Sequence, residues 1–262
     1  MPANQTKAAR PETALKVLLL DVETSPNLAY VWGKYEQNTL GDMLQERKII
    51  CYAWNWLGES KIDALALPMF KTYRRDRMDN RELIEALHAT LSQADIVVGH
   101  NVKQFDAPMC NTDFLAHGMK PPPPYRMVDT LEVLRSKFRL NSNKLDDAGA
   151  RLGIGRKVQH RGFNMWLGCL NGDAKSWAEM VKYNIGDVAL LKRLYMKVRP
   201  WMTNHPNMTA PLALEACPGC GSKHLNRSGW IYTRTGKNQR FACRDCGKWS
   251  TGKRKWDGWR FS

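Results

Sequence analysis

The most informative stretch of the sequence is Val17-Leu18-Leu19-Leu20-Asp21-Val22-Glu23-Thr24. Four consecutive aliphatic residues are typical of a strand that is buried on both faces, and here they run directly into two carboxylates. Residues i and i+2 of a strand point to the same side, so Asp21 and Glu23 should project together. They repel each other unless a cation lies between them, and a hard divalent ion such as Mg²⁺ or Mn²⁺ suits oxygen ligands. A solvated acidic turn before Pro26 is the alternative, and this stretch alone does not separate the two.

The segments that follow predict an α/β fold with a mixed sheet. Residues 28–32, 48–56 and 61–67 have strand composition, and three strands in succession suggest an antiparallel meander attached to the first strand. A helical pattern over 81–87 leads into a short buried strand at 95–99. This β-α-β crossover predicts that the second part of the sheet is parallel.

Further helices are expected in the second half of the domain. Asp79 or Asn80 is available as the N-cap of the helix that starts at Arg81. The remaining helical patterns cover residues 105–117, 129–138, 144–152 and 176–198.

The charge of the chain points to a polyanionic partner. The 262 residues carry a formal net charge of +15, which favours nucleic acid first and an acidic membrane surface second. Residues 1–14 are polar, contain two prolines and lack the apolar core of a signal peptide, and no run approaches membrane-spanning length. We therefore expect a soluble, cytoplasmic protein with a disordered arm at 1–14.

Two further motifs place carboxylates near the first pair. The loop Gly99-His100-Asn101-Val102-Lys103-Gln104-Phe105-Asp106 delivers Asp106 to the C-terminal edge of the sheet, where open α/β sheets keep their sites. In Tyr183-Asn184-Ile185-Gly186-Asp187, a spacing of four places Tyr183 and Asp187 on one helical face. Each acid has an ordinary alternative, a helix cap for Asp106 and a solvated helical position for Asp187.

Two neighbouring polar residues receive structural interpretations. Asp129 could be a fifth ligand, but it also fits the N-cap of the following helix, which we favour. His100 is interpreted as a structural hydrogen-bonding residue rather than a ligand.

Taken in order, DxE after the first strand, NxxxFD after a Gly-His loop and YxxxD on a late helix resemble the DEDD family of 3′→5′ exonucleases. This is the DnaQ-like group of the ribonuclease-H-like superfamily, and Tyr183 resembles the subgroup with tyrosine rather than histidine. The resemblance covers roughly residues 15 to 200. It implies that Asp21 bridges two Mg²⁺ or Mn²⁺ ions, that Glu23 and Asp187 complete one, and that Asp106 holds the second, partly through water.

The chemistry explains why such groups are needed. Phosphodiester hydrolysis requires an in-line water, charge relief on the phosphoryl oxygens and stabilisation of the departing 3′-oxygen, which two divalent ions about 4 Å apart can supply. An unperturbed phenol has a pKa near 10, so Tyr183 is better suited to orient the water than to act as a base. Asn101 and Phe105 are expected to shape the pocket, and Thr24 to meet the terminal nucleotide.

A second module lies at the C-terminus. Two CxxC pairs separated by 22 residues favour one structural Zn²⁺ bound by Cys217, Cys220, Cys243 and Cys246. A redox motif is the alternative, and the second pair argues against it. The module resembles a zinc ribbon, and residues 235–241 resemble ribbons fused to some DNA transposases.

This module is basic and aromatic. Residues 217–262 contain eleven Lys and Arg against two Asp and Glu, with seven aromatic rings between them. Such interleaving suits single-stranded nucleic acid, and Lys237 and Arg240 are expected to contact it. Some of the rings are instead expected to pack the small module itself. The domains predicted are an exonuclease over 15–203, a linker over 204–216 and the ribbon with its basic tail over 217–262.

The function expected is metal-dependent 3′→5′ removal of nucleotides from DNA, with single strands preferred and a replication or recombination protein as a possible partner. The preference for DNA rests on the transposase-like ribbon alone. Trimming of RNA 3′ ends is the competing enzymatic function. A non-catalytic nucleic-acid-binding adaptor is the non-enzymatic one, and the complete set of four acids argues against it.

Overall fold

The computed structural model describes residues 15–32, 40–210, 216–234 and 236–252. The chain divides into two compact units, of which one spans Lys16–Val198 and the other contains the chain from Arg199 onward. The expected arm at 1–14 and the basic tail at 253–262 lie outside the described residues, as does the segment 211–215 of the expected linker.

The first unit is built on a five-stranded sheet of order β5-β4-β1-β6-β7. The central strand β1 (Val17–Thr24) pairs antiparallel with β4 (Ile49–Trp56) and parallel with β6 (Ile96–Gly99). The edge strands are β5 (Asp63–Ala66) and β7 (Arg126–Asp129). The predicted mixed sheet, with its parallel β-α-β crossover, is confirmed. The aliphatic run of β1 is buried because helices cover both faces of the sheet.

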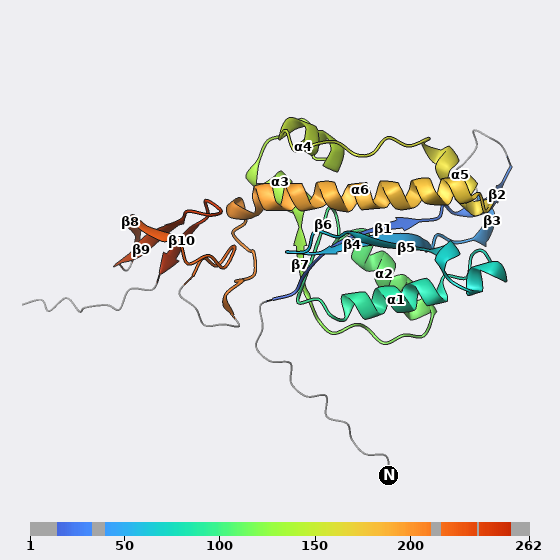
Figure 1. Cartoon of the computed structure of the whole chain (residues 1–262), viewed down its shortest axis with the longest axis horizontal. Coiled ribbons are helices and arrows are strands. Elements are labelled where there is room, and N and C mark those ends of the chain that lie inside the picture. The colour runs from blue at the N-terminus through green and yellow to red at the C-terminus, as the bar shows by residue number, and fades with distance from the viewer. Residues whose placement is uncertain (1–14, 33–39, 211–215, 235, 253–262) are drawn as a thin grey trace, which may run out of the picture. The chain divides into compact units, whose positions relative to one another are not determined.

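Helices form a layer on each side of this sheet (Figure 1). The long helix α6 (Ala174–Val198) lies against β1, β4 and β5, whereas α1 (Arg81–Leu91) and α2 (Asp106–Ala116) pack on the opposite face. Three shorter helices pack against α6: α3 (Thr130–Lys137), α4 (Leu145–Arg151) and α5 (Phe163–Leu170). Single 3₁₀ turns occur at Leu67–Met69, Thr72–Arg74 and Arg199–Trp201. The helix α5 is absent from the sequence-based expectations.

The expected strand at 28–32 does not join the meander. Instead β2 (Leu28–Val31) pairs with β3 (Leu40–Gln45) in a separate two-stranded sheet, and the meander consists of β1, β4 and β5. The side chains of Leu28 and Val31 are about half exposed. Because this strand has no buried face to match against the main sheet, its composition could not fix its partner.

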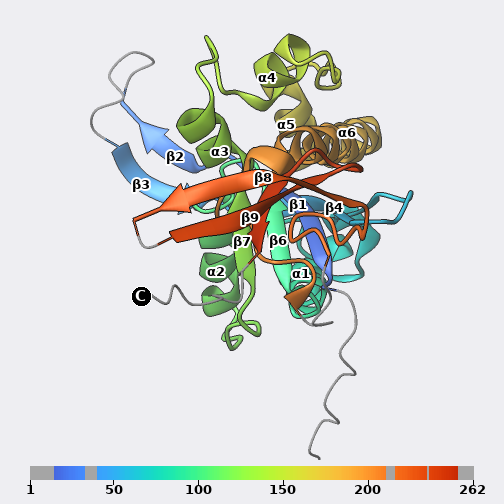
Figure 2. The ribbon, with the colours of Figure 1, turned by 90° about the vertical axis from the view of Figure 1, so that its left-hand side faces the viewer.

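The second unit contains an antiparallel sheet of order β10-β9-β8, of which Figure 2 labels the neighbouring strands β8 and β9. Its strands are β8 (Leu225–Thr233), β9 (Gly236–Cys243) and β10 (Trp249–Gly252). The strands β8 and β9 pair antiparallel and form a hairpin. We call residues 217–252 the ribbon. Among the described residues of the whole chain, no helix is long and apolar enough to span a bilayer.

Candidate active site

Three carboxylates converge between β1 and α6. Each of Asp21, Glu23 and Asp187 offers an oxygen, and these oxygens lie within 4.8 Å of one another. Asp21 and Glu23 alternate with Val22 along β1, and Asp187 is buried on the helix that crosses this face of the sheet. Alternation along the strand and the packing of α6 therefore bring together two motifs that are far apart in the sequence.

The shared burial raises the pKa values of these groups. Desolvation and the charges of Asp106, Glu23 and Asp187 raise the pKa of Asp21 well above its usual value. Desolvation and the charge of Asp187 raise the pKa of Glu23 to about 8. The Oδ1 atom of Asp187 is buried and has no hydrogen-bond partner among the described residues. A set of close carboxylate oxygens that includes an unpartnered one fits a hard divalent cation.

Asp106 approaches the cluster from α2 but is bound to the strand backbone. Its Oδ1 atom accepts a hydrogen bond of 3.1 Å from the backbone N–H of Val22. Burial raises the pKa of Asp106 to about 7, and its charge raises the pKa of Asp21. The fourth predicted acid is therefore next to Asp21, although it is outside the three-carboxylate cluster.

Tyr183 and Lys157 complete the polar site. The Nζ atom of Lys157 donates to the hydroxyl oxygen of Tyr183 at 2.9 Å and to Oδ2 of Asp187 at 2.6 Å. Lysine has only donors, so the Tyr183 oxygen accepts from Lys157. The Tyr183 hydroxyl can itself donate to Asp187, which partly offsets the rise that burial causes in the pKa of that carboxyl. Burial and the charge of Asp187 raise the pKa of Tyr183, which keeps the phenol protonated near neutral pH.

Lys157 is a site residue that sequence reasoning missed. Asp146 positions it, because its Oδ1 accepts from the backbone N–H of Lys157 at 2.7 Å and its Oδ2 from Arg156 at 2.9 Å. The position of Lys157 depends on how the loop after α4 folds back onto α6. Among the 40 Lys and Arg residues of this chain, no motif distinguishes it.

Asn184 is a second residue that was missed. Its Nδ2 atom donates to Oδ2 of Asp21 at 2.6 Å, and its Oδ1 atom accepts from the thiol of Cys51 at 3.5 Å. The side chain is fully buried. The sequence signal that could have identified Asn184 is its position directly after Tyr183, because both side chains are buried on α6.

Asp129 binds the backbone of the loop that follows β6. As expected, Asp129 caps α3 by accepting from Leu131 N, and it also accepts from Asn101 N at 2.9 Å. This contact holds Asn101 at a φ of 73°, a left-handed conformation that asparagine tolerates. Phe105 packs against the hydrophobic core. The ring of His100 contacts the hydroxyl of Thr130 and the carbonyl of Asn143, which confirms its structural role.

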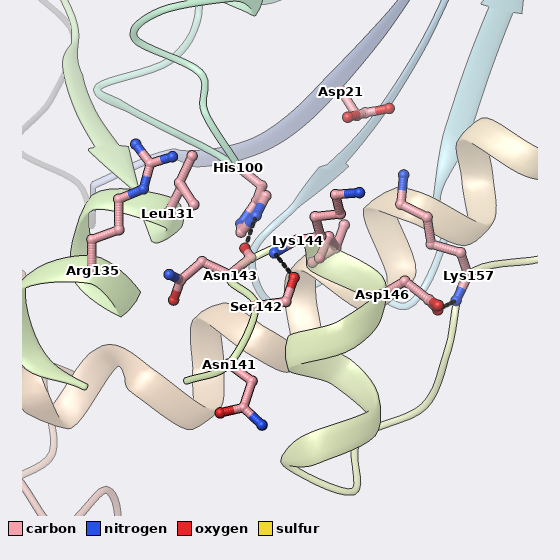
Figure 3. Close-up of a pocket in the computed structure, with 11 residues that line it drawn as sticks. Asp21, His100, Leu131, Arg135, Asn141, Ser142, Asn143, Lys144, Asp146 and Lys157 are labelled. Atoms are coloured by element: carbon pink, nitrogen blue, oxygen red, sulfur yellow. Dashed lines mark hydrogen bonds between the residues drawn. The ribbon is translucent and has the colours of Figure 1, made fainter. Parts of the chain in front are cut away.

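Cavities lie on two sides of the cluster. Thr24, Pro26, His160, Phe163 and Trp166 line one of 390 Å³ together with Ser25, Arg47 and Gly162. The indole N–H of Trp166 donates to the Thr24 carbonyl at 3.1 Å, which ties α5 to the end of β1. The other cavity, of 580 Å³, adjoins Asp21 and Lys157 (Figure 3).

The four paired cysteines converge in the ribbon. All four are free thiols, and the sulfurs of Cys217 and Cys246, like those of Cys220 and Cys243, are 3.7 Å apart. Tetrahedral zinc with Zn–S bonds of about 2.3 Å places its sulfurs about 3.8 Å apart, so the donor set fits zinc. The two expected substrate contacts lie on this ribbon, with Lys237 over the ring of Trp230 at 5.0 Å and Arg240 over that of Trp249 at 5.5 Å.

Comparison of this chain with known proteins supports this fold. The structure is similar to the family B DNA polymerase from the hyperthermophilic archaeon Pyrobaculum calidifontis, with a TM-score of 0.53 and 14% sequence identity. The match covers 85% of this chain but 31% of the polymerase chain, and at this identity it shows the fold alone. No curated protein matches. Residues 55–199 match the RNase H superfamily. With more than half of its length matched, the chain belongs to the RNase H superfamily.

Proposed function

We propose that residues 15–203 form a metal-dependent 3′→5′ exonuclease that removes nucleotides from DNA 3′ ends, preferring single strands. The observation that carries this proposal is the cluster of Asp21, Glu23 and Asp187 beside Tyr183 and Lys157. The order of these residues matches the DEDD pattern with tyrosine. Membership of the RNase H superfamily supports hydrolysis of nucleic acid as the type of reaction.

The resident metals would be held by the acidic residues. Asp21, Glu23 and Asp187 would hold one Mg²⁺ or Mn²⁺ ion, and Asp21 with Asp106 a second. Bound there, such ions neutralise charge on the phosphoryl oxygens and on the leaving 3′-oxygen.

The remaining residues position the reactants. Tyr183, held by Lys157, would donate its proton in a hydrogen bond to the attacking water or a phosphoryl oxygen, which fixes the angle of attack. Asn184 would hold one oxygen of Asp21 and leave the other free for a cation. The ammonium group of Lys157 adds positive charge where the phosphate binds.

The cavity at Thr24 supports exonucleolytic cleavage. Rings of Phe163, Trp166 and His160 surround a volume of 390 Å³ next to the carboxylates, which suits the base of a single terminal nucleoside. The rings of His160 and Trp166 also contact the ring of Tyr183, so the first phosphodiester bond would lie at the acidic residues.

The ribbon would bind the substrate through residues other than those of the active site. We propose one structural Zn²⁺ at its four cysteines, and contacts from Lys237 and Arg240 to a single strand. The excess of basic residues over acidic ones in this part of the sequence, interleaved with aromatic rings, supports that assignment. We propose that residues 204–216 link the exonuclease domain to the ribbon, and that a replication or recombination protein is a partner.

One assay tests the main proposal. Single-stranded DNA, duplex DNA and RNA, each labelled at the 5′ end, are incubated with the protein and Mg²⁺, and the products are separated by length. The expected result is a ladder that shortens one nucleotide at a time, fastest for single-stranded DNA. Asp21→Ala should lower the rate on the order of a thousandfold or more, because its charge no longer anchors the cations.

The control is Asp63→Asn, which removes a carboxylate that pairs with exposed Lys61. It should cleave like the unmodified protein. Immediate release of the labelled nucleotide would indicate the opposite polarity, and faster cleavage of RNA would favour RNA trimming. Tight binding without any cleavage would contradict the enzymatic proposal.

A further inference from the structure

A second cavity extends the site away from Thr24. The 580 Å³ cavity beside Asp21 shares Asn141 and Ser142 with a neighbouring cavity of 520 Å³. We call the two together the α3–α4 groove, because their lining comes mainly from the end of α3, the start of α4 and the loop between them. In Figure 3, the side chains of Lys144 and Lys157 extend towards Asp21. The groove therefore reaches Asp21, one of the proposed catalytic carboxylates.

The groove is lined by basic side chains. These are Arg135, Arg139, Lys144, Arg151 and Lys157. Two of the three acids in the lining are already engaged, since Asp21 belongs to the cluster and Asp146 pairs with Arg156. Arg135, Lys144 and Arg151 form no ion pair with any carboxylate of the described chain, and all three are exposed. Their charges are therefore available to an anionic ligand.

The two sides of the cluster differ in chemistry. The Thr24 cavity is aromatic and contains one basic side chain, Arg47, whereas the α3–α4 groove has five and is larger. Asp21 and Thr24 are three residues apart on β1, which separates them by about 10 Å. An aromatic pocket suits one base, and an extended basic groove suits several successive phosphates.

We propose that the α3–α4 groove holds the phosphodiester backbone of the strand that precedes the bond to be cut, with Arg135, Lys144 and Arg151 as phosphate contacts. This inference rests on the proposed function and deepens it, because it gives the substrate a direction. The last nucleoside lies at Thr24, the scissile phosphate at the acidic cluster, and the preceding nucleotides along α3 and α4.

The first test measures binding without cleavage. Affinities of the full chain for oligothymidylates of about three and about twelve nucleotides are measured by fluorescence anisotropy, with Ca²⁺ in place of Mg²⁺. The variant Arg135→Gln/Arg151→Gln is compared with Lys71→Gln/Arg74→Gln, which removes the same charge from the 3₁₀ segment before α1. The ribbon is identical in all proteins, so differences between them belong to the first unit.

The expected loss is confined to the groove variant and grows with strand length. For the longer strand, two lost phosphate contacts should reduce the slope of log K against log[salt] by about 1.4. The control pair should bind like the unmodified protein. Equal losses in both variants, or none in the groove variant, would overturn the proposal.

The second test locates the strand directly. A twelve-nucleotide strand carries one photoreactive 4-thiothymidine about three nucleotides from its 3′ end, and crosslinked peptides are identified by mass spectrometry. Crosslinks within residues 135–151 are expected. Crosslinks confined to α5 or to the ribbon would reject the assignment. Because neither test needs turnover, a chain that binds in the groove but does not cleave would contradict the proposed function and leave this inference standing.

Discussion

Asn184 shows how one side chain can orient a carboxylate of the proposed active site. It donates to Oδ2 of Asp21 while its own oxygen accepts from buried Cys51, so its amide is fixed from both sides. Partners of this kind orient metal ligands, and their removal typically costs about 10- to 100-fold in metal affinity or activity.

We predict that Asn184→Ala lowers kcat by about 10- to 100-fold and raises the Mg²⁺ concentration needed for half-maximal activity, with a smaller effect on KM for DNA. Asn184→Asp should be worse, because it adds a charge beside Asp21. Cys51→Ala removes the thiol that donates to Asn184 and should change kcat and the Mg²⁺ dependence only mildly. The measurement is a Mg²⁺ titration of the initial cleavage rate. Unchanged metal dependence in Asn184→Ala would mean that the strand alone orients Asp21.

At the scale of elements, the ribbon depends on its cysteines. Among its described residues, few apolar side chains are buried, and the buried ones include Cys217 and Cys243 themselves. A sheet with so small a core needs another source of stability, and the proposed structural metal would supply it.

We predict that Cys220→Ser lowers the zinc content from about one ion per chain to near zero and weakens binding of long single strands. Cleavage of very short oligonucleotides should persist, because the carboxylates lie in the other unit. Zinc is measured with a chromogenic chelator after denaturation, and Cys169→Ser, which changes a buried cysteine of α5, is the control. Full zinc content in Cys220→Ser would remove this cysteine from the proposed ligands.

At the scale of the whole molecule, the acidic cluster links stability to pH. Burial raises the pKa of Asp21, that of Glu23 to about 8 and that of Asp106 to about 7. A group whose pKa is higher in the folded than in the unfolded chain stabilises the fold below its unfolded pKa. That contribution is lost as the pH rises through the folded pKa. Without divalent ions, the free energy of unfolding should therefore fall between about pH 4.5 and pH 8.

We predict that added Mg²⁺ or Ca²⁺ raises the melting temperature, and more at pH 8 than at pH 6, because ions bind the ionised carboxylates. Asp21→Asn should raise the metal-free melting temperature at pH 8 and reduce the response to ions. Glu85→Gln, on the exposed face of α1, should behave like the unmodified protein. Comparing variants at one pH cancels any contribution from the cysteines. A melting temperature that responds to ions equally in Asp21→Asn and in the unmodified chain would place the cation elsewhere.

Local sequence indicated the strands β1, β4, β5 and β6, most helices and the acidic motifs, but not the edge strand β7. The buried strand of β1, the helical spacing of Tyr183 and Asp187, and the cap at Asp129 depend on neighbours a few residues away. Such short-range patterns can be recognised in the sequence because the periodicity of a helix or strand determines which side chains share a face. The two CxxC pairs predict a metal site for the same reason, because the spacing of the two ligands within each pair is local.

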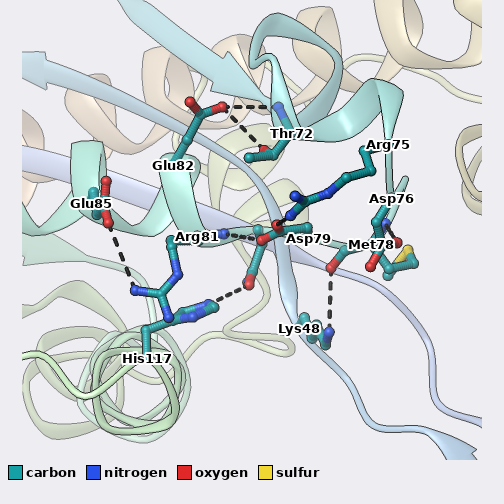
Figure 4. Close-up of polar contacts among 11 residues, drawn as sticks. Lys48, Thr72, Arg75, Asp76, Met78, Asp79, Arg81, Glu82, Glu85 and His117 are labelled. Atoms are coloured by element: carbon teal, nitrogen blue, oxygen red, sulfur yellow. Dashed lines mark hydrogen bonds and ion pairs between the residues drawn. The ribbon is translucent and has the colours of Figure 1, made fainter.

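Contacts between distant segments depend on the folded structure. In Figure 4, for example, the side chain of Lys48 donates to the carbonyl of Met78, in the residues before α1. Asn80 stands at the N-cap position but makes no capping hydrogen bond from its side chain. Its amide instead donates to the carbonyl of Ile49 and to Asp113, and its oxygen contacts His117. A cap and a buried crosslink require the same residue type, so composition could not distinguish them.

The same limit applies to the site itself. Lys157, Asn184 and the aromatic pocket of α5 reach the carboxylates because loops and helices far apart in the chain fold onto one edge of the sheet. The pairing of β2 with β3, outside the main sheet, could not be predicted for a comparable reason. Its side chains are largely exposed, so no buried face specified a pairing register with the main sheet. Local motifs were enough to predict the carboxylates that converge in the proposed site. The packing of α4, α5 and α6 decided which groups orient them, because such contacts depend on long-range geometry that no local period encodes.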